Sequence, residues 1–254
     1  MVDAIVRILA GCHVGDATMP PTELYNEGWM LRLVLDWLAR NPNVEHVLSF
    51  APGARWYSEA LLASRFLPSA RNDTRAEGYT HADGVVGHFT IKPGERGEAV
   101  PKPDARQFMV LEAKMGSPLS AGTKNAPAYD QAARNVACIA HVIGAAGLHP
   151  KSLDRLAFYV IAPAAQINAR VFGSLMTKAS IETKVRQRIA AYEGQCDAWL
   201  DKVFLPTLDH IDLRLLSWEE ILAPLEKTAE TESLQLFYER CLLFNPPRRP
   251  VNQV

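Results

Sequence analysis

The chain has 254 residues and a formal net charge of −1, with 48% hydrophobic and 22% charged residues. This composition is typical of a globular protein with one sizeable core, and it excludes disordered and fibrous classes. Because the net charge is close to zero, the protein as a whole does not attract polyanions, and a nucleic-acid site would need a local basic patch.

The cysteines indicate a reducing compartment. The four cysteines are Cys12, Cys138, Cys196 and Cys241. None of them belongs to a C-x-x-C pair, and their spacing is not that of a disulfide framework. We expect free, mostly buried thiols. The stretch "ILAGC" at 8–12 has the form of a lipoprotein cleavage box, but Asp3 and Arg7 interrupt the short apolar stretch before it. With no run of about 18 apolar residues, the sequence predicts a cytoplasmic protein.

The first strongly helical stretch covers residues 23–40. Its apolar side chains gather on one face around Leu31, and Glu27 falls inside that face. A carboxylate in a core-facing stripe is costly unless a partner satisfies it. Glu27 is therefore either a residue of the frayed first turns paired with an arginine, or a residue directed into a site.

The next elements are a helix predicted at 56–66 and two strand-like segments at 79–86 and 87–91, which a glycine-containing turn separates. Residues 92–106 contain three prolines and no apolar periodicity, so they predict a loop that joins neighbouring strands. The segment 107–114 predicts a buried strand that becomes charged at its end.

The second half of the chain predicts helices and strands in alternation: an apolar helix at 126–146, a strand at 155–162 that is apolar on both faces, a long helical region at 166–204, a short strand at 211–216 and a final helix at 230–244. In "SWEEIL", Ser217 and Glu220 have the spacing of a capping box, so a helix should begin there. These elements predict a single α/β domain with a helical C-terminal elaboration.

Three residues could carry chemistry at the end of the 107–114 strand. Alternate residues of a strand point to the same face, so Glu112 and Lys114 project together. Asp83 lies on a neighbouring predicted strand, and a hairpin with the 92–106 loop could bring it beside Glu112. Two converging carboxylates provide the oxygen ligands that Mg²⁺ prefers. A lysine beside them can stabilise charge that develops on a phosphate.

The stretches "ADGVV" (82–86) and "VLEAK" (110–114) resemble the signature of the PD-(D/E)XK nuclease superfamily. The resemblance implies the restriction-endonuclease-like fold, an αβββαβ core with a central mixed four-stranded sheet flanked by helices. This core would cover about 23–163 of a single domain, 1–254, with further strand and helices at about 164–254. The family's metal site implies that Asp83, Glu112 and the Ala113 carbonyl bind Mg²⁺ or Mn²⁺, while Lys114 positions the attacking water.

The resemblance extends to two more residues. Glu27 matches a Glu on the family's first core helix and would bind a second ion or hold Lys114. Gln131, in "YDQAARNVACI", matches a Gln on the helix after the E-x-K strand and would orient Lys114 or a phosphate. Two features depart from the family pattern: Ala82 precedes the aspartate in place of proline, and the loop before Glu112 is long.

The resemblance implies a catalytic function. It implies phosphodiester hydrolysis of nucleic acid, with DNA favoured, in phage defence or DNA repair. A homodimer is favoured because the cleavage of both strands of a duplex commonly uses two active sites. Two groups of basic residues are candidates for phosphate contact: Arg55, Arg65, Arg71 and Arg75 before the site, and Lys178, Lys184, Arg186 and Arg188 after it. A charge run on a helix is more often a solvated face.

Other interpretations remain open. Asp83 could be a hairpin-turn residue, Glu112 and Lys114 a solvent-facing ion pair, and Gln131 an ordinary helix residue. A zinc hydrolase would use His81, His88 and His141 with the same carboxylates, although none has the usual spacing of zinc ligands. The second class of function is a catalytically inactive member of the fold that acts as a binding or structural module.

Overall fold

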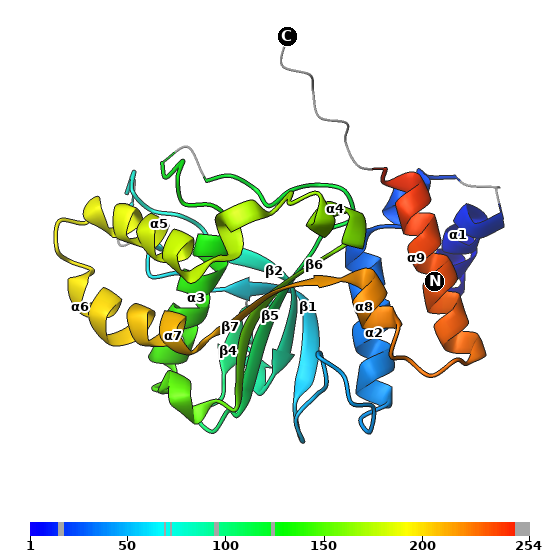
Figure 1. The fold of residues 1–254 in the computed structure, drawn as a ribbon, viewed down its shortest axis with the longest axis horizontal. Helices are drawn as coiled ribbons and strands as arrows, with labels where there is room; N and C mark the ends of the chain where they lie inside the picture. Colours follow the sequence, from blue (N-terminus) through cyan, green and yellow to red (C-terminus); the bar gives the residue numbers. More distant parts are fainter. Residues whose placement is uncertain (15–17, 69, 72, 94–96, 123–124, 247–254) are drawn as a thin grey trace, which may run out of the picture.

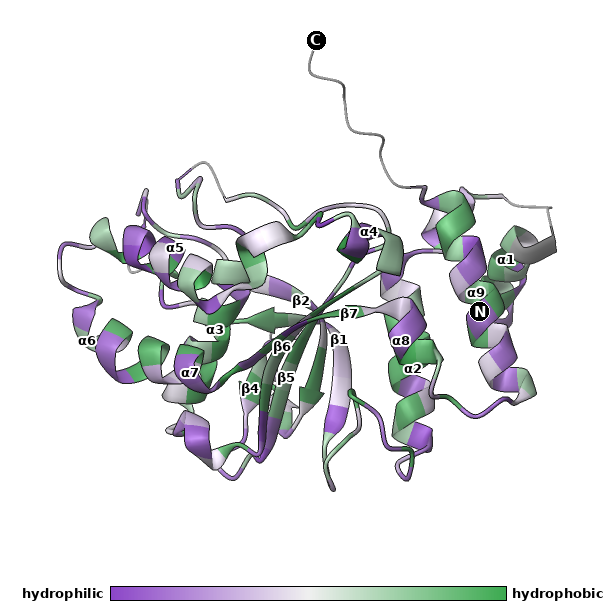
Figure 2. Ribbon diagram, in the orientation of Figure 1, coloured by the Kyte–Doolittle hydropathy of each residue, from purple (hydrophilic) through white to green (hydrophobic). Residues whose placement is uncertain are grey.

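The computed structural model describes all residues except 15–17, 69, 72, 94–96, 123–124 and 247–254. Its centre is a five-stranded mixed sheet with helices on both faces (Figure 1). The strand order is β1-β2-β5-β6-β7, in which β1, β2 and β5 pair antiparallel and β5, β6 and β7 pair parallel. The central strands are largely hydrophobic (Figure 2), as strands covered on both faces must be.

The strands of this sheet are β1 (Arg55–Leu62), β2 (Thr80–Gly87), β5 (Gln107–Ala113), β6 (Arg155–Ala162) and β7 (Asp212–Ser217). A separate antiparallel ribbon consists of β3 (Phe89–Ile91) and β4 (Ala99–Pro101).

The α-helices are α1 (Val2–Val14), α2 (Glu27–Arg40), α3 (Gln131–Ala145), α4 (Ala164–Asn168), α5 (Lys178–Ala190), α6 (Asp197–Trp199), α7 (Leu205–His210), α8 (Trp218–Leu222) and α9 (Ala229–Phe244). Short 3-10 turns lie at Pro21–Glu23, Pro150–Ser152 and Gly173–Met176, and a π-helical turn lies at Leu200–Phe204. Within the described part of the chain, no helix has both the length and the apolarity needed to cross a bilayer.

The alternation of side chains along the strands divides the core into two parts. Val86 of β2 packs with α2 on one face of the sheet, whereas Val85 packs with α3 on the other face. Gly84 allows α2 to approach closely, because a Cβ at that position would lie 3.0 Å from a methyl group of Leu31. All four cysteines are free and buried, which confirms the sequence prediction.

Both core helices begin at a capping side chain. Asn26 and Asp130 each accept a hydrogen bond from the backbone N–H three residues further on, at 2.9 and 3.0 Å. Such caps satisfy N–H groups that the helix leaves unpaired. They fix Glu27 and Gln131 as the first residues of α2 and α3.

Much of the predicted secondary structure is confirmed. The strand at 155–162 is β6, the helix at 230–244 is α9 within one residue at its start, and the capping box at Ser217 is present. The strand at 211–216 is β7, which joins β6 in the same sheet. The sheet therefore has five strands, whereas the sequence predicted four.

Several predicted elements are wrong. The segment 56–66 is largely the edge strand β1, because pairing with β2 overrides the helix-forming residues of "SEALL". Of 87–91, residue 87 is the end of β2, and residues 89–91 form β3, which lies outside the main sheet. The helical region 166–204 is interrupted, with Gly173 and Gly194 at positive φ. In the loop 92–106, residues 94–96 lie outside the described residues.

We predict that Gly87→Ala destabilises the protein by about 3 kcal/mol or more. Gly87 has a φ of +150°, and a Cβ there would lie 2.1 Å from the backbone oxygen of Gln107 on β5. Gly53→Ala is the matched control, because Gly53 also has positive φ (+79°) but a Cβ there meets nothing within 4 Å. The control should cost about 1 kcal/mol. Urea unfolding of both variants would measure the difference, and equal losses would contradict it.

Candidate active site

Asp83 and Glu112 meet where β2 and β5 separate. The antiparallel register pairs Gly84 with Leu111, so Asp83 and Glu112 occupy the next opposed positions. The Asp83 side chain closes this end of the pairing, since its Oδ2 accepts a hydrogen bond of 2.7 Å from the Ala113 backbone N–H. The predicted proximity of the two carboxylates is therefore present in the structure.

Lys114 completes the group. Its Nζ lies 2.6 Å from Glu112 Oε1, and the two side chains are only 12% and 2% exposed. The other carboxylate oxygen, Glu112 Oε2, is buried and has no partner among the described residues. A buried charged oxygen without a partner is costly, so this atom would be stabilised by a hydrogen-bond donor or a cation. The ion pair considered from the sequence is present, but it does not face solvent, because Glu112 is buried and Lys114 is largely buried.

The electrostatics of the pair are unfavourable without a cation. Burial, and next the charge of Glu112, raise the pKa of Asp83 from 3.8 to about 7, against the opposing effects of the Ala113 N–H and Lys114. Two adjacent carboxylates in a buried site cannot both ionise freely. A divalent cation between them would remove this repulsion.

The backbone of Lys114 is held on two sides. Its N–H donates to the Ile161 carbonyl of β6 at 2.8 Å, and its carbonyl accepts from the indole N–H of Trp218 at 3.0 Å. Trp218 is fully buried at the start of α8. The sequence analysis did not identify Trp218, because no local pattern links two residues that lie 104 positions apart.

The Ala113 carbonyl lies on the same side of the strand as the site. In an extended strand the N–H and C=O groups of one residue point the same way. The N–H of Ala113 points to Asp83, so its carbonyl also points towards β2. This orientation fits the predicted role of Ala113 as a backbone ligand.

Gln131 makes no hydrogen bond with Lys114 in the described part of the structure. Its Oε1 accepts from the backbone N–H of Ser120 at 2.9 Å, which ties the loop after Lys114 to the start of α3. The amide nitrogen of Gln131 donates to no described residue. The prediction that Gln131 orients a phosphate stays a prediction.

The structure does not bring Glu27 to the carboxylate pair. α2 packs on the face of the sheet opposite to the one that carries Glu112. Glu27 lies instead near Cys241 of α9, where burial and then the charge of Glu27 raise the thiol pKa to about 12. Among the residues that the structure describes, no three His, Cys, Asp or Glu side chains are placed to hold an ion together.

In the described part of the chain, the histidines of the zinc interpretation do not form a metal-binding group with the carboxylates. His88 Nδ1 lies within hydrogen-bonding distance of the N–H groups of Arg106 and Gln107, and its Nε2 lies 3.0 Å from the Pro52 carbonyl. His81 is exposed. Neither histidine makes a contact with Asp83 in the described part of the structure.

The basic residues after the site are used within the protein. Lys178, Lys184 and Arg186 bond to the Asp209 carbonyl, Asp130 and Glu182 respectively. Arg188 is 4% exposed and lies over the rings of three aromatic residues: Phe66, Tyr129 and Tyr192. The expectation of either a phosphate-binding row or a solvated face on this helix is therefore wrong for Lys184 and Arg188.

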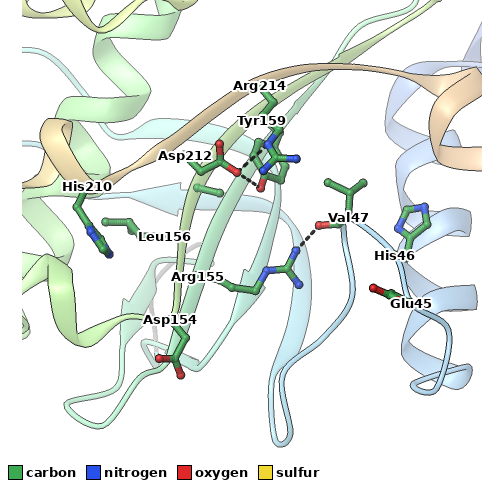
Figure 3. A pocket seen from close by; sticks show the side chains of 11 residues that line it. Glu45, His46, Val47, Asp154, Arg155, Leu156, Tyr159, His210, Asp212 and Arg214 are labelled. Carbon is green, nitrogen blue, oxygen red and sulfur yellow. Dashed lines mark hydrogen bonds and ion pairs between the residues drawn. The ribbon is translucent and has the colours of Figure 1, made fainter.

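A cavity of about 690 Å³ lies away from the carboxylate pair, beside the first residues of β6 and β7 (Figure 3). Several of its polar groups have internal partners. The Arg155 guanidinium donates to the Val47 and Ser49 carbonyls, and Asp212 accepts from Tyr159 and Arg214 at 2.7 and 2.8 Å.

The histidine of this cavity is also structural. His46 Nδ1 accepts from the Leu48 N–H, so its Nε2 carries the proton and donates to the Ile221 carbonyl at 2.9 Å. Burial lowers the pKa of His46 and keeps the ring neutral. These groups of the cavity hold segments of the fold together. Because they are already bonded within the protein, the cavity is a weaker candidate for a reactive site than the carboxylate pair.

No protein-family model, no curated protein and no solved structure matches the chain. The candidate site therefore depends on the geometry of Asp83, Glu112 and Lys114 alone.

We predict that Asp83→Asn stabilises the metal-free protein at pH 8 by about 1–3 kcal/mol. The folded-state pKa of about 7 lies above the unfolded value near 3.8, so Asp83 favours folding at low pH and loses this contribution as pH rises through 7. Asparagine keeps an oxygen that can accept from the Ala113 N–H and carries no charge.

The measurement is urea unfolding in EDTA at several pH values. The advantage of the variant should shrink steadily from pH 8 towards pH 4. A variant that is less stable than wild type at pH 8, or whose difference does not change with pH, would contradict the prediction.

Proposed function

We propose that this chain is a metal-dependent nuclease of the PD-(D/E)XK superfamily, which hydrolyses phosphodiester bonds in nucleic acid. The observation that carries the proposal is the placement of Asp83 and Glu112 on adjacent strands with Lys114 bonded to Glu112. Metal-dependent phosphodiester hydrolysis uses paired carboxylates to bind the ion and a lysine beside them. In this structure, Glu112 Oε2 is free of partners among the described residues.

The order of elements supports a restriction-endonuclease-like fold. Helix α2 is followed by the antiparallel strands β1, β2 and β5, then by helix α3 and the parallel strand β6. This is an αβββαβ order, although its first strand is β1 and not the predicted segment 87–91. Asp83 lies on the second strand and Glu112 on the third, where the superfamily carries its acidic residues.

The residues fit a divalent cation. Asp83, Glu112 and the Ala113 carbonyl would hold Mg²⁺ or Mn²⁺, because Glu112 Oε2 lacks a partner among the described residues and because burial, and next the charge of Glu112, raise the pKa of Asp83. When bound, the ion stabilises negative charge on a phosphate and lowers the pKa of a water.

The chain's own groups do the rest of the proposed chemistry. Lys114 Nζ, released in part from Glu112, orients the water for attack and offsets the charge that develops on the phosphate oxygens. The amide nitrogen of Gln131, at the start of α3, donates to a phosphate oxygen. Trp218 keeps Lys114 in place through the backbone.

The proposed substrate is nucleic acid, with DNA favoured, in phage defence or DNA repair. The net charge of −1 means that overall electrostatic attraction contributes little to binding. A cytoplasmic location is proposed from the four free, buried thiols.

The second candidate is an inactive binding module that keeps the fold. One observation favours it: within the described residues, no third carboxylate joins Asp83 and Glu112. In this case the ion pair between Lys114 and Glu112 would be a structural element of the strand end.

We predict that the protein cleaves nucleic acid in Mg²⁺ or Mn²⁺ and not in EDTA. Glu112→Gln and Lys114→Met should each lower the rate by about 10²–10³-fold, because each removes a charge that acts on the phosphate or its ligands. Plasmid, linear duplex DNA, single-stranded DNA and RNA are the substrates. Asp154→Asn is the control, since Asp154 forms an exposed ion pair with Arg106.

Metal binding separates the two candidates when no cleavage is seen. If Mn²⁺ raises the melting temperature of wild type and Glu112→Gln abolishes this rise, the metal site is supported. The natural substrate would then be one that was not among those tested. Absence of both cleavage and a metal-dependent rise in wild type would reject the nuclease and favour the inactive module.

A further inference from the structure

The cavity beside β6 and β7 is separate from the carboxylate pair. Glu112 lies near the end of β5, level with Val160 of β6, whereas the cavity lies beside the start of β6. The two sites are also on opposite faces of the sheet, because Tyr159 packs in the part of the core under α2 and Val160 in the part under α3. A ligand in the cavity would therefore not occupy the carboxylate site.

The alternation of side chains along the two strands gives the cavity its floor. Ala157 and Tyr159 of β6 lie on the same face as Asp212 and Arg214 of β7, and the parallel register pairs Ala157 with Asp212 and Tyr159 with Arg214. The small side chain of Ala157 leaves room among the larger ones, and residues 45–47 form one wall (Figure 3). The volume of about 690 Å³ falls within the range of about 300–1,000 Å³ for small-molecule sites.

The polar groups of the floor are held in place by contacts within the protein. Asp212 Oδ2 accepts a hydrogen bond of 2.7 Å from the Tyr159 hydroxyl and lies 2.8 Å from Arg214 Nε. The Arg214 guanidinium also lies over the Tyr159 ring, 5.8 Å from its centroid. Because an ion pair and a ring already orient this guanidinium, it loses little freedom when a ligand binds.

Two groups of the floor remain available to a ligand. The outer nitrogens of Arg214 and Oδ1 of Asp212 form no hydrogen bond with the residues that the structure describes, and the two side chains are 53% and 40% exposed. Arg214 offers donors and positive charge, and Asp212 offers an acceptor and negative charge. Glu45 adds an exposed carboxylate on the wall. These charges match a ligand that has both an acidic group and an N–H donor.

We propose that this cavity binds a small molecule that carries an anionic group and an amino group. The anionic group binds the outer nitrogens of Arg214, and the amino group donates to Asp212 Oδ1. A guanidinium can bind a carboxylate or a phosphate through two parallel hydrogen bonds. Two kinds of molecule share this chemistry: amino acids, which carry a carboxylate and an ammonium group, and nucleoside monophosphates, which carry a phosphate and an amino group on the base.

Binding at this cavity is consistent with the bonds inside it and does not depend on the nuclease assignment. The Arg155 guanidinium is bonded to the Val47 and Ser49 carbonyls, and the His46 ring is bonded on both nitrogens, so the wall and the floor are joined before any ligand arrives. Such bonds leave few groups for chemistry, but they give a binding site a fixed shape.

The test is isothermal titration calorimetry of the full chain in EDTA, with the Kd as the readout. The probes are the proteinogenic amino acids, taken singly, together with AMP, CMP and GMP. Wild type should bind at least one of them with a Kd below about 1 mM. Arg214→Met should raise that Kd about 10-fold or more, because it removes charged hydrogen bonds to the anionic group. If AMP binds, adenosine should bind more weakly by a similar factor and should not respond to Arg214→Met.

Arg40→Met is the matched control. Arg40 is 51% exposed and its Nε lies 3.0 Å from Asp36, much as Arg214 lies beside Asp212, but it belongs to α2 and does not line the cavity. This control should leave the Kd unchanged, and far-UV circular dichroism confirms that each variant is folded. Three results would each overturn the proposal: no probe binds wild type below about 5 mM, Arg214→Met binds as tightly as wild type, or Glu112→Gln abolishes binding and so places the ligand at the carboxylate pair.

Discussion

The hydrogen bond from the Ala113 N–H to Asp83 Oδ2 is the contact on which the candidate site depends. At this point β2 and β5 stop pairing through their backbones, and a carboxylate takes the place of a backbone acceptor. The same bond that closes the sheet therefore fixes Asp83 beside Glu112. Because a backbone N–H cannot move without the strand, the position of the Asp83 carboxylate follows that of β5.

The carboxylate pair differs from the large cavity in the way its polar groups are satisfied. The large cavity beside β6 and β7 is polar, yet its arginines, His46 and Asp212 have partners inside the protein. At the strand end the opposite holds, since Glu112 Oε2 has no described partner and the pKa of Asp83 is raised. A buried acid whose pKa is raised by burial and by a neighbouring charge is characteristic of functional sites, and the convergence of Asp83, Glu112 and Lys114 is stronger support than cavity volume.

The sequence predicted what local patterns encode. The apolar run of β6, the capping box at Ser217 and the strand-end position of Glu112 each depend on residues close in the chain, and each is present. The helix predicted at 56–66 failed because "SEALL" favours a helix locally, while β1 exists only through its pairing with β2. Glu27 was placed in the site by resemblance, but α2 covers the other face of the sheet. Trp218 was missed because its contact with Lys114 is visible only after folding.

The segment after residue 163 is part of the candidate site and not an accessory to it. The parallel register places Ser217 of β7 beside Ala162 of β6, and the capped helix α8 begins at the next residue. Trp218 is thereby brought to the Lys114 carbonyl, while β6 itself binds the Lys114 N–H. Both backbone groups of the lysine are thus fixed by strands or helices that follow it in the sequence. A four-stranded core alone would leave the carbonyl of Lys114 without its buried partner. The position of Lys114 would then be less fixed, and Lys114 is the only cation that contacts Glu112 among the described residues.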